Sequence, residues 1–124
     1  VKAKERPIVI ITSNAEKELP DAFLRRCIFH YISFPEKEQM KEIVNAHFEN
    51  LEENVLKNCL DTFYWIRSVK DVRKKPSTSE LIDWIRALIL GGVDTDNLRE
   101  KLPFLGVLIK KDEDLEAVKK AGIY

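Results

Sequence analysis

Glycine, net charge and long apolar runs are scarce in this chain of 124 residues, and each shortage excludes a class of protein. None of its four glycines precedes a lysine, so the sequence has no glycine-rich phosphate-binding loop. Lysine plus arginine equals aspartate plus glutamate at 21 each, which excludes a global field for nucleic acid or an anionic membrane. No apolar run approaches the roughly 20 residues of a membrane span, and residues 2–7 lack the apolar core of a signal peptide. The expected compartment is the cytoplasm.

Cysteine and histidine are also few, and their spacing predicts no metal site. Cys27 and Cys59 form no CxxC or Cys/His pattern, so both are expected to be reduced, buried, small apolar residues. His30 and His47 have no acidic or cysteine partner at ligand spacing, so each is expected to be structural.

The composition predicts a globular domain, and the first residue predicts that this domain belongs to a longer product. Hydrophobic residues make up 44% and charged residues 34%, as in a folded domain rather than a disordered tail. The chain begins with Val1 and its one methionine is Met40. The natural product is therefore expected to extend upstream or to have been trimmed there.

Two apolar runs near the start predict β-strands. Residues 7–12 contain four consecutive β-branched aliphatics, the pattern of a strand buried on both faces of a parallel sheet. Residues 28–34, "IFHYISF", read as a second strand, and a short helix from Pro20 to Leu24 lies between them. The expected fold is mainly α with a small β portion, in which residues 1–35 belong to an α/β sheet whose other strands are elsewhere.

Residues 36–124 predict a small helical domain. Apolar side chains recur at helical spacing, Ser77 with Glu80 fits a capping box, and Gly91-Gly92 fits a helix stop. Trp65 is expected in the core, as is Trp84 on the third of these helices. The expected helices span 35–51, 53–69, 77–92, 94–102 and 112–122, with the basic loop "KDVRKKP" at 70–76.

Chemistry is most plausible just after the first predicted strand. Ligands of open parallel sheets sit beyond the carboxyl ends of strands, where Asn14 could hold a water in line with a phosphate. On spacing alone, residues 12–14 more commonly just end a strand and cap a turn. Arg25 and Arg26 end the next helix, where a guanidinium could neutralise a transferring phosphoryl group or simply complement the helix dipole.

The order and spacing of these residues resemble a known family. "PIVIITSNAEKELPDAFLRRCIFHYISFP" is similar to the sensor 1 to arginine-finger segment of AAA+ ATPases of the MoxR-related group, in which a strand ends in T-[SA]-N and "LPDAxLxRF" follows. "KKPSTSELIDWIRAL", residues 74–88, resembles the lid helix of the same group. Together the two stretches span under half of the chain.

The resemblance implies roles for individual residues. Asn14 falls on sensor 1, which positions the attacking water near the γ-phosphate. Arg26 falls on the arginine finger that reaches the nucleotide of a neighbouring subunit, with Arg25 as its nearest competitor because the usual "DRF" has become "RRC". A finger acting in trans implies a ring, usually hexameric, and the helical domain becomes the lid over the nucleotide.

One departure from the family concerns the lid. Relatives often carry a sensor 2 arginine where this chain reads Ser77-Thr78-Ser79. Its positive role could pass to Lys74, to Lys75 or to the backbone N–H groups at the helix start, which attract anions. Both lysines could equally belong to a solvated basic loop.

A second departure is that two motifs of the family are missing. There is no phosphate loop, and no acidic strand end for Mg²⁺, since the sole Asp-Glu step, Asp112-Glu113, follows two lysines. The resemblance then implies that this chain is a C-terminal fragment of an ATPase. The complete ATPase would bind ATP and Mg²⁺ and remodel a partner protein, while this chain alone should be inactive and should bind neither ATP nor Mg²⁺ tightly. The alternative is a free-standing helical protein-binding module. Nucleic-acid binding through the basic loop is the weakest hypothesis, because the loop has no aromatic residue.

Overall fold

The computed structural model describes residues 4–13 and 19–122. The chain divides into two compact units, Val1–Ser33 and Phe34–Tyr124, and each is described by itself. The described residues of the second unit, hereafter the helical unit, contain a continuous hydrophobic core, whereas the first contains one short helix.

That short helix is α1, Asp21–Arg26, and it begins directly after Pro20 as predicted. The carbonyl of Pro20 accepts hydrogen bonds from the backbone N–H groups of Phe23, at 2.9 Å, and Leu24. None of its residues is buried. Proline suits this position because its fixed φ angle favours a first helical turn.

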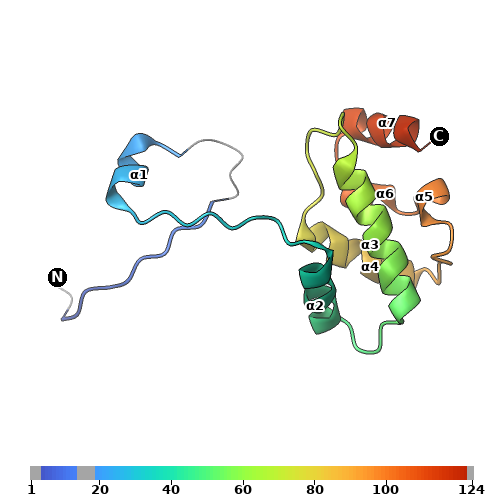
Figure 1. The fold of residues 1–124 in the computed structure, drawn as a ribbon, viewed down its shortest axis with the longest axis horizontal. Helices are drawn as coiled ribbons and strands as arrows, with labels where there is room; N and C mark the ends of the chain where they lie inside the picture. Colours follow the sequence, from blue (N-terminus) through green and yellow to red (C-terminus); the bar gives the residue numbers. More distant parts are fainter. Residues whose placement is uncertain (1–3, 14–18, 123–124) are drawn as a thin grey trace. The chain divides into compact units, whose positions relative to one another are not determined.

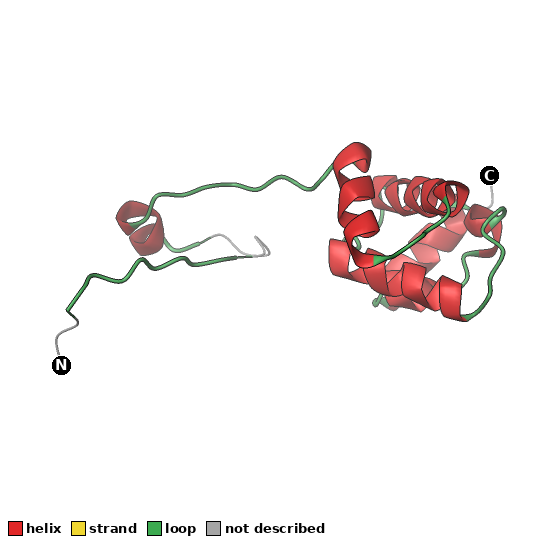
Figure 2. Ribbon diagram, turned by 90° about the horizontal axis from the view of Figure 1, so that it is seen from below, coloured by secondary structure: helices red, strands yellow, loops and turns green. Residues whose placement is uncertain are grey.

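The predicted β portion is wrong. Every element that the structure describes is a helix, and Figure 2 shows residues 7–12 and 28–34 as loops. Their apolar side chains are almost fully accessible, with Ile8 92% and Ile28 102% exposed. A strand exists only where a neighbouring strand accepts and donates its backbone hydrogen bonds, and an apolar run alone cannot supply that neighbour. The two strands of an AAA+ nucleotide-binding domain are therefore not seen.

The helical unit confirms the predicted helices between residues 36 and 124, with shifted ends and one addition, α6 (Figure 1). Helix α2 packs against α3, α3 against α5, and α4 against α6. The helices are α2 (Lys37–His47), α3 (Glu53–Ser68), α4 (Thr78–Leu90), α5 (Leu98–Lys101), α6 (Leu105–Leu108) and α7 (Asp112–Ala121).

Helix α3 supplies the centre of the core. Its predicted apolar stripe is buried, with Phe63 and Ile66 fully inaccessible to solvent. Each such side chain contributes about 1.5–3 kcal/mol when removed from water. Trp84 of α4 is also buried, as predicted, and its indole Nε1 donates a 2.8 Å hydrogen bond to the Pro103 carbonyl. Trp65 is half-buried against the same core.

The boundaries of α4 also confirm the sequence pattern. The Ser77 hydroxyl accepts a hydrogen bond from the Glu80 N–H, and the Glu80 carboxylate accepts one from the Ser77 N–H. This reciprocal pair is a capping box. At the other end Gly91 caps the helix, and Gly92 adopts the left-handed φ of 61° that favours glycine.

The first residues of the helical unit are fixed to α3. The Tyr64 hydroxyl donates to the Pro35 carbonyl at 2.5 Å, and the Arg67 guanidinium lies 3.4 Å from the centre of the Phe34 ring. A cation over an aromatic face is attracted by the ring quadrupole. These two contacts make residues 34 and 35 part of the helical unit.

The two cysteines differ, and the prediction for one is wrong. Cys59 lies in the core, and its burial raises the pKa of the thiol to about 12. Cys27 is exposed because it follows α1 in the unit that has no core in its described residues. An apolar side chain is buried only where other side chains cover it, and the described residues of this unit supply none that do.

Candidate functional site

The residue assigned to sensor 1, Asn14, lies outside the described residues. Thr12, two residues before it, is exposed in a loop.

Arg25 and Arg26 lie in the last turn of α1, and both are exposed. No ion pair engages either guanidinium within the part of the chain that the structure describes. Neighbouring residues on a helix project about 100° apart, so a single target can meet only one of them. The geometry leaves both side chains able to reach an external anion.

The basic loop between α3 and α4 carries Lys74 and Lys75, and the two lysines differ in their contacts. The Lys75 ammonium is half-buried and donates to the Val69 carbonyl at 2.5 Å, so it closes the loop on itself. The Lys74 side chain is exposed, and only its backbone N–H has a described hydrogen bond. Lys74 is therefore the lysine of the pair that can meet a ligand without giving up an internal contact.

The backbone N–H and the hydroxyl of Ser77 both form hydrogen bonds at the start of α4. In addition to the backbone contacts of the capping box, the hydroxyl donates a 3.0 Å hydrogen bond to the Glu80 carboxylate. The carboxylate places a negative charge at the positive end of the helix dipole. A phosphate approaching this helix start would therefore compete with the protein's own anion.

A buried carboxylate that the sequence did not single out, Asp114 of α7, holds the basic loop in place. It is 2% exposed, and its oxygens accept hydrogen bonds from the backbone N–H groups of Arg73, at 2.9 Å, and Lys74, at 3.2 Å. The Arg73 hydrogen bond is the main cause of a lowered pKa for Asp114, with the Lys74 hydrogen bond and the charges of Lys111 and Arg73 adding to it while desolvation opposes them. The carboxylate thus stays ionised although it is buried.

The end of the loop is tied as well. The Arg67 guanidinium donates to the carbonyl of Pro76, directly before the capping box. The loop is thereby fixed near its start by Lys75, in its middle by Asp114 and at its end by Arg67. Every one of these contacts goes to backbone, so the loop keeps its path whatever its exposed side chains do.

The predicted residues do not come together in a described cavity. A hollow of about 390 Å³ lies between α5, α6 and α7, and a smaller one of about 150 Å³ between α3 and the segment before α5. Neither is lined by the two arginines, by the two lysines or by Ser77. The described residues also contain no group of three or more histidine, cysteine or acidic side chains that could hold a metal ion.

No protein-family model, no curated protein and no solved structure matches this chain. Among the described residues, no helix has the length and apolar character needed to cross a bilayer.

The Asp114 contacts generate a stability prediction. Asp114→Asn should lower the free energy of unfolding at neutral pH by about 1 to 3 kcal/mol, because the two backbone N–H groups use both carboxylate oxygens and an amide offers one oxygen and an NH₂ donor in their place. Glu116→Gln, an equal charge change at an exposed site of α7, should leave it within about 0.5 kcal/mol. Chemical denaturation of both variants measures the difference.

The same contact has a pH dependence of defined sign. Because the pKa of Asp114 is lower in the folded chain, its contribution is complete above the unfolded pKa of about 3.9 and is lost as pH falls through the folded value. Asp114→Asn should therefore flatten the loss of stability below about pH 4. Parallel pH curves for the variant and the unaltered chain would contradict the role given to this carboxylate.

Proposed function

We propose that this chain is the C-terminal part of an AAA+ ATPase of the MoxR-like group. In the complete ATPase, residues 1–35 would form the C-terminal part of the nucleotide-binding domain, with sensor 1 and the arginine finger. Residues 36–124 would form the lid. The complete ATPase would bind and hydrolyse ATP with Mg²⁺ in a cytoplasmic ring, a hexamer as is usual in the family, and remodel a partner protein. The observation that carries this proposal is the ordered pair of sequence motifs, "TSNAEKELPDAFLRR" and "KKPSTSELIDWIRAL", in one chain.

The accessible apolar residues of the first unit support the proposal. Ile8, Ile10 and Ile32 are more than 80% exposed, and so large a set of uncovered aliphatic side chains marks a surface that normally meets other protein. The rest of a nucleotide-binding domain would cover them. The helical unit needs no such cover, since it buries its own core.

Within the proposal, an arginine at the end of α1 acts as the finger. Arg26 is the assigned residue and Arg25 the competitor, and both side chains are accessible at the last turn. A guanidinium there would stabilise the charge that develops on the transferring phosphoryl group of a neighbouring subunit. Asn14 would orient the attacking water.

The contacts of the basic loop favour Lys74 as the replacement for the sensor 2 arginine. Its ammonium is accessible, whereas that of Lys75 is engaged with the Val69 carbonyl. Ser77 would contribute through the start of α4, where N–H groups and dipole attract a phosphate despite the Glu80 carboxylate. This chain alone lacks the phosphate loop, so it should neither hydrolyse ATP nor hold it tightly.

A second candidate function is a helical module that binds another protein without nucleotide chemistry. The self-contained core of the helical unit favours it, since such a unit can fold without a nucleotide-binding domain. The two candidates differ in the natural polypeptide. An ATPase needs a G-x-x-x-x-G-K-[ST] sequence upstream of residue 1, and an intact mass matching 124 residues would favour the module.

The finger assignment predicts a split between binding and turnover. In the complete ATPase, Arg26→Ala should leave ATP affinity nearly unchanged and reduce hydrolysis by roughly a thousandfold or more, because the finger stabilises the transition state. Arg25→Ala is the matched control and should keep most of the turnover. If Arg25→Ala alone abolishes hydrolysis, the finger is Arg25, and if neither change matters, the segment contributes no finger. Asn14→Ala should also reduce turnover more than binding.

The two loop lysines form a second matched pair. In the complete ATPase, Lys74→Ala should weaken ATP binding roughly tenfold, which corresponds to about 1.4 kcal/mol, with no change in melting temperature. Lys75→Ala should instead lower the free energy of unfolding by about 1 kcal/mol, because it removes the hydrogen bond to Val69. Titration with a fluorescent ATP analogue and thermal melts separate the two effects. An unchanged nucleotide affinity for Lys74→Ala would remove the sensor 2 role from this loop.

A further inference from the structure

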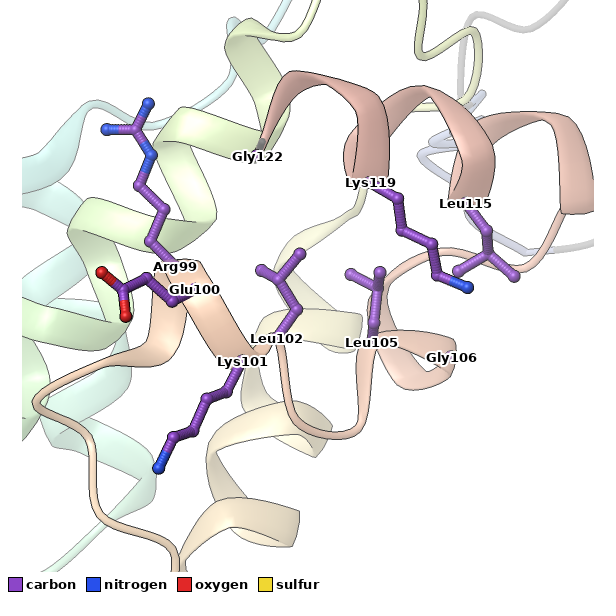
Figure 3. A pocket seen from close by; sticks show the side chains of 9 residues that line it. All are labelled: Arg99, Glu100, Lys101, Leu102, Leu105, Gly106, Leu115, Lys119 and Gly122. Carbon is purple, nitrogen blue, oxygen red and sulfur yellow. The ribbon is translucent and has the colours of Figure 1, made fainter. Parts of the chain in front are cut away.

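The larger hollow of the helical unit belongs to none of the roles above. It measures about 390 Å³ and lies where α5, α6 and α7 meet (Figure 3), and neither Lys74 nor Lys75 of the basic loop lines it. All of its lining residues fall within the described part of one unit. It can therefore be examined as a docking site independently of the proposed ATPase.

The floor of the hollow is aliphatic. Leu102 and Leu105 point toward α7, and Leu115 points back toward them from α7 (Figure 3). Leu105 is buried, whereas Leu102 and Leu115 are only half-buried although they adjoin the core. The two partly accessible leucines would gain contact with an apolar side chain of a partner.

The backbone that builds the floor is held in an unfavourable conformation. Leu102 and Phe104, on either side of Pro103, have left-handed φ angles of 45° and 55°. Residues with a Cβ adopt this region only when their surroundings impose it, and such positions cluster at ligand-binding segments. Here the hydrogen bond from the Trp84 indole to the Pro103 carbonyl holds the floor segment against the core.

The rim of the hollow is mainly positive. Arg99, Lys101 and Lys119 line it against a single carboxylate, that of Glu100. In Figure 3 the Lys119 side chain points from α7 toward the floor, while Arg99 and Lys101 point away from it. The Arg99 guanidinium lies 4.3 Å from the centre of the Trp65 ring, so Lys119 is the cation nearest the floor. An occupant therefore needs an apolar body with negative charge beside it.

We infer that this hollow docks an acidic peptide segment of a partner protein, with one leucine or phenylalanine side chain on the leucine floor and a flanking carboxylate beside Lys119. Charge complementarity selects the acidic flanks, and the aliphatic floor selects the anchor. Nucleic acid fits less well, because no aromatic ring lines the hollow to stack a base.

The test uses the whole chain and a fluorescein-labelled acidic peptide with one central leucine, followed by fluorescence anisotropy. Lys119→Glu should weaken binding roughly tenfold, and added salt should weaken binding to the unaltered chain. Lys120→Glu is the matched control, since it makes the same charge change one residue along α7 at an exposed site that does not line the hollow. It should have little effect.

A second variant fills the hollow instead of changing its charge. Gly106 lines the hollow, and a Cβ there would meet no atom within 4 Å. Gly106→Leu should therefore reduce the space for the leucine anchor and weaken binding, while Gly106→Ala, which adds only the Cβ, should keep binding. Thermal melts verify that each variant folds.

Three results would overturn the inference. They are the absence of peptide binding to the unaltered chain, equal losses for Lys119→Glu and Lys120→Glu, and equal binding of a control peptide with serine in place of leucine. Binding of a single-stranded oligonucleotide that depends on Lys119 while the acidic peptide fails would assign the hollow to nucleic acid instead.

Discussion

Burial of the apolar stripe of α3 is the interaction on which the rest of the helical unit depends. Helices α2 and α5 pack against this helix, and Tyr64 and Arg67 on its surface fix residues 34 and 35. Removing such a set of side chains from water is the dominant favourable term in folding. Where the chain offers no comparable set of facing side chains, as in the described residues before Phe34, aliphatic residues remain accessible.

A second layer of organisation fixes a segment that has no regular structure. The basic loop is held through backbone groups by Lys75, Asp114 and Arg67, which come from the loop itself, from α7 and from α3. These contacts determine which charges remain available. Lys75 becomes structural, and Lys74 is presented to solvent. The charges that this loop presents to solvent are therefore determined as much by the buried carboxylate of α7 as by its own sequence.

Helical periodicity and capping residues were sufficient to predict most of the helical unit. The Ser77–Glu80 box and the Gly91-Gly92 stop mark the ends of α4 because helix termini depend on local side chains and φ angles. The strand predictions were wrong because strand pairing is not local: an apolar run such as residues 8–11 indicates a tendency toward burial but does not identify the segment that would cover it. The prediction that Cys27 is buried was wrong for the same reason.

The sites show the same division between local and distant information. Asp114 is 41 residues from the Arg73 N–H that it binds, and in the sequence it is simply one of three acids in a first helical turn. The hollow beneath α7 depends on the left-handed backbone conformation of Leu102 and Phe104. The sequence does not predict this conformation, because neither residue is glycine. The roles proposed for Asn14 and the two arginines, in contrast, rest on motif order alone.

Native-state hydrogen exchange by NMR tests most directly whether the buried core of α3 and α4 organises this molecule. Amides at residues 60–66 and 82–88 should be the most protected and should exchange with one shared free energy, because they open only when the core unfolds. Amides at residues 8–11 and 28–32 should exchange at nearly the rate of an unstructured peptide, since their side chains are exposed and no described strand pairs them. Comparable protection in both sets, or rapid exchange within α3, would contradict the central place given to that core.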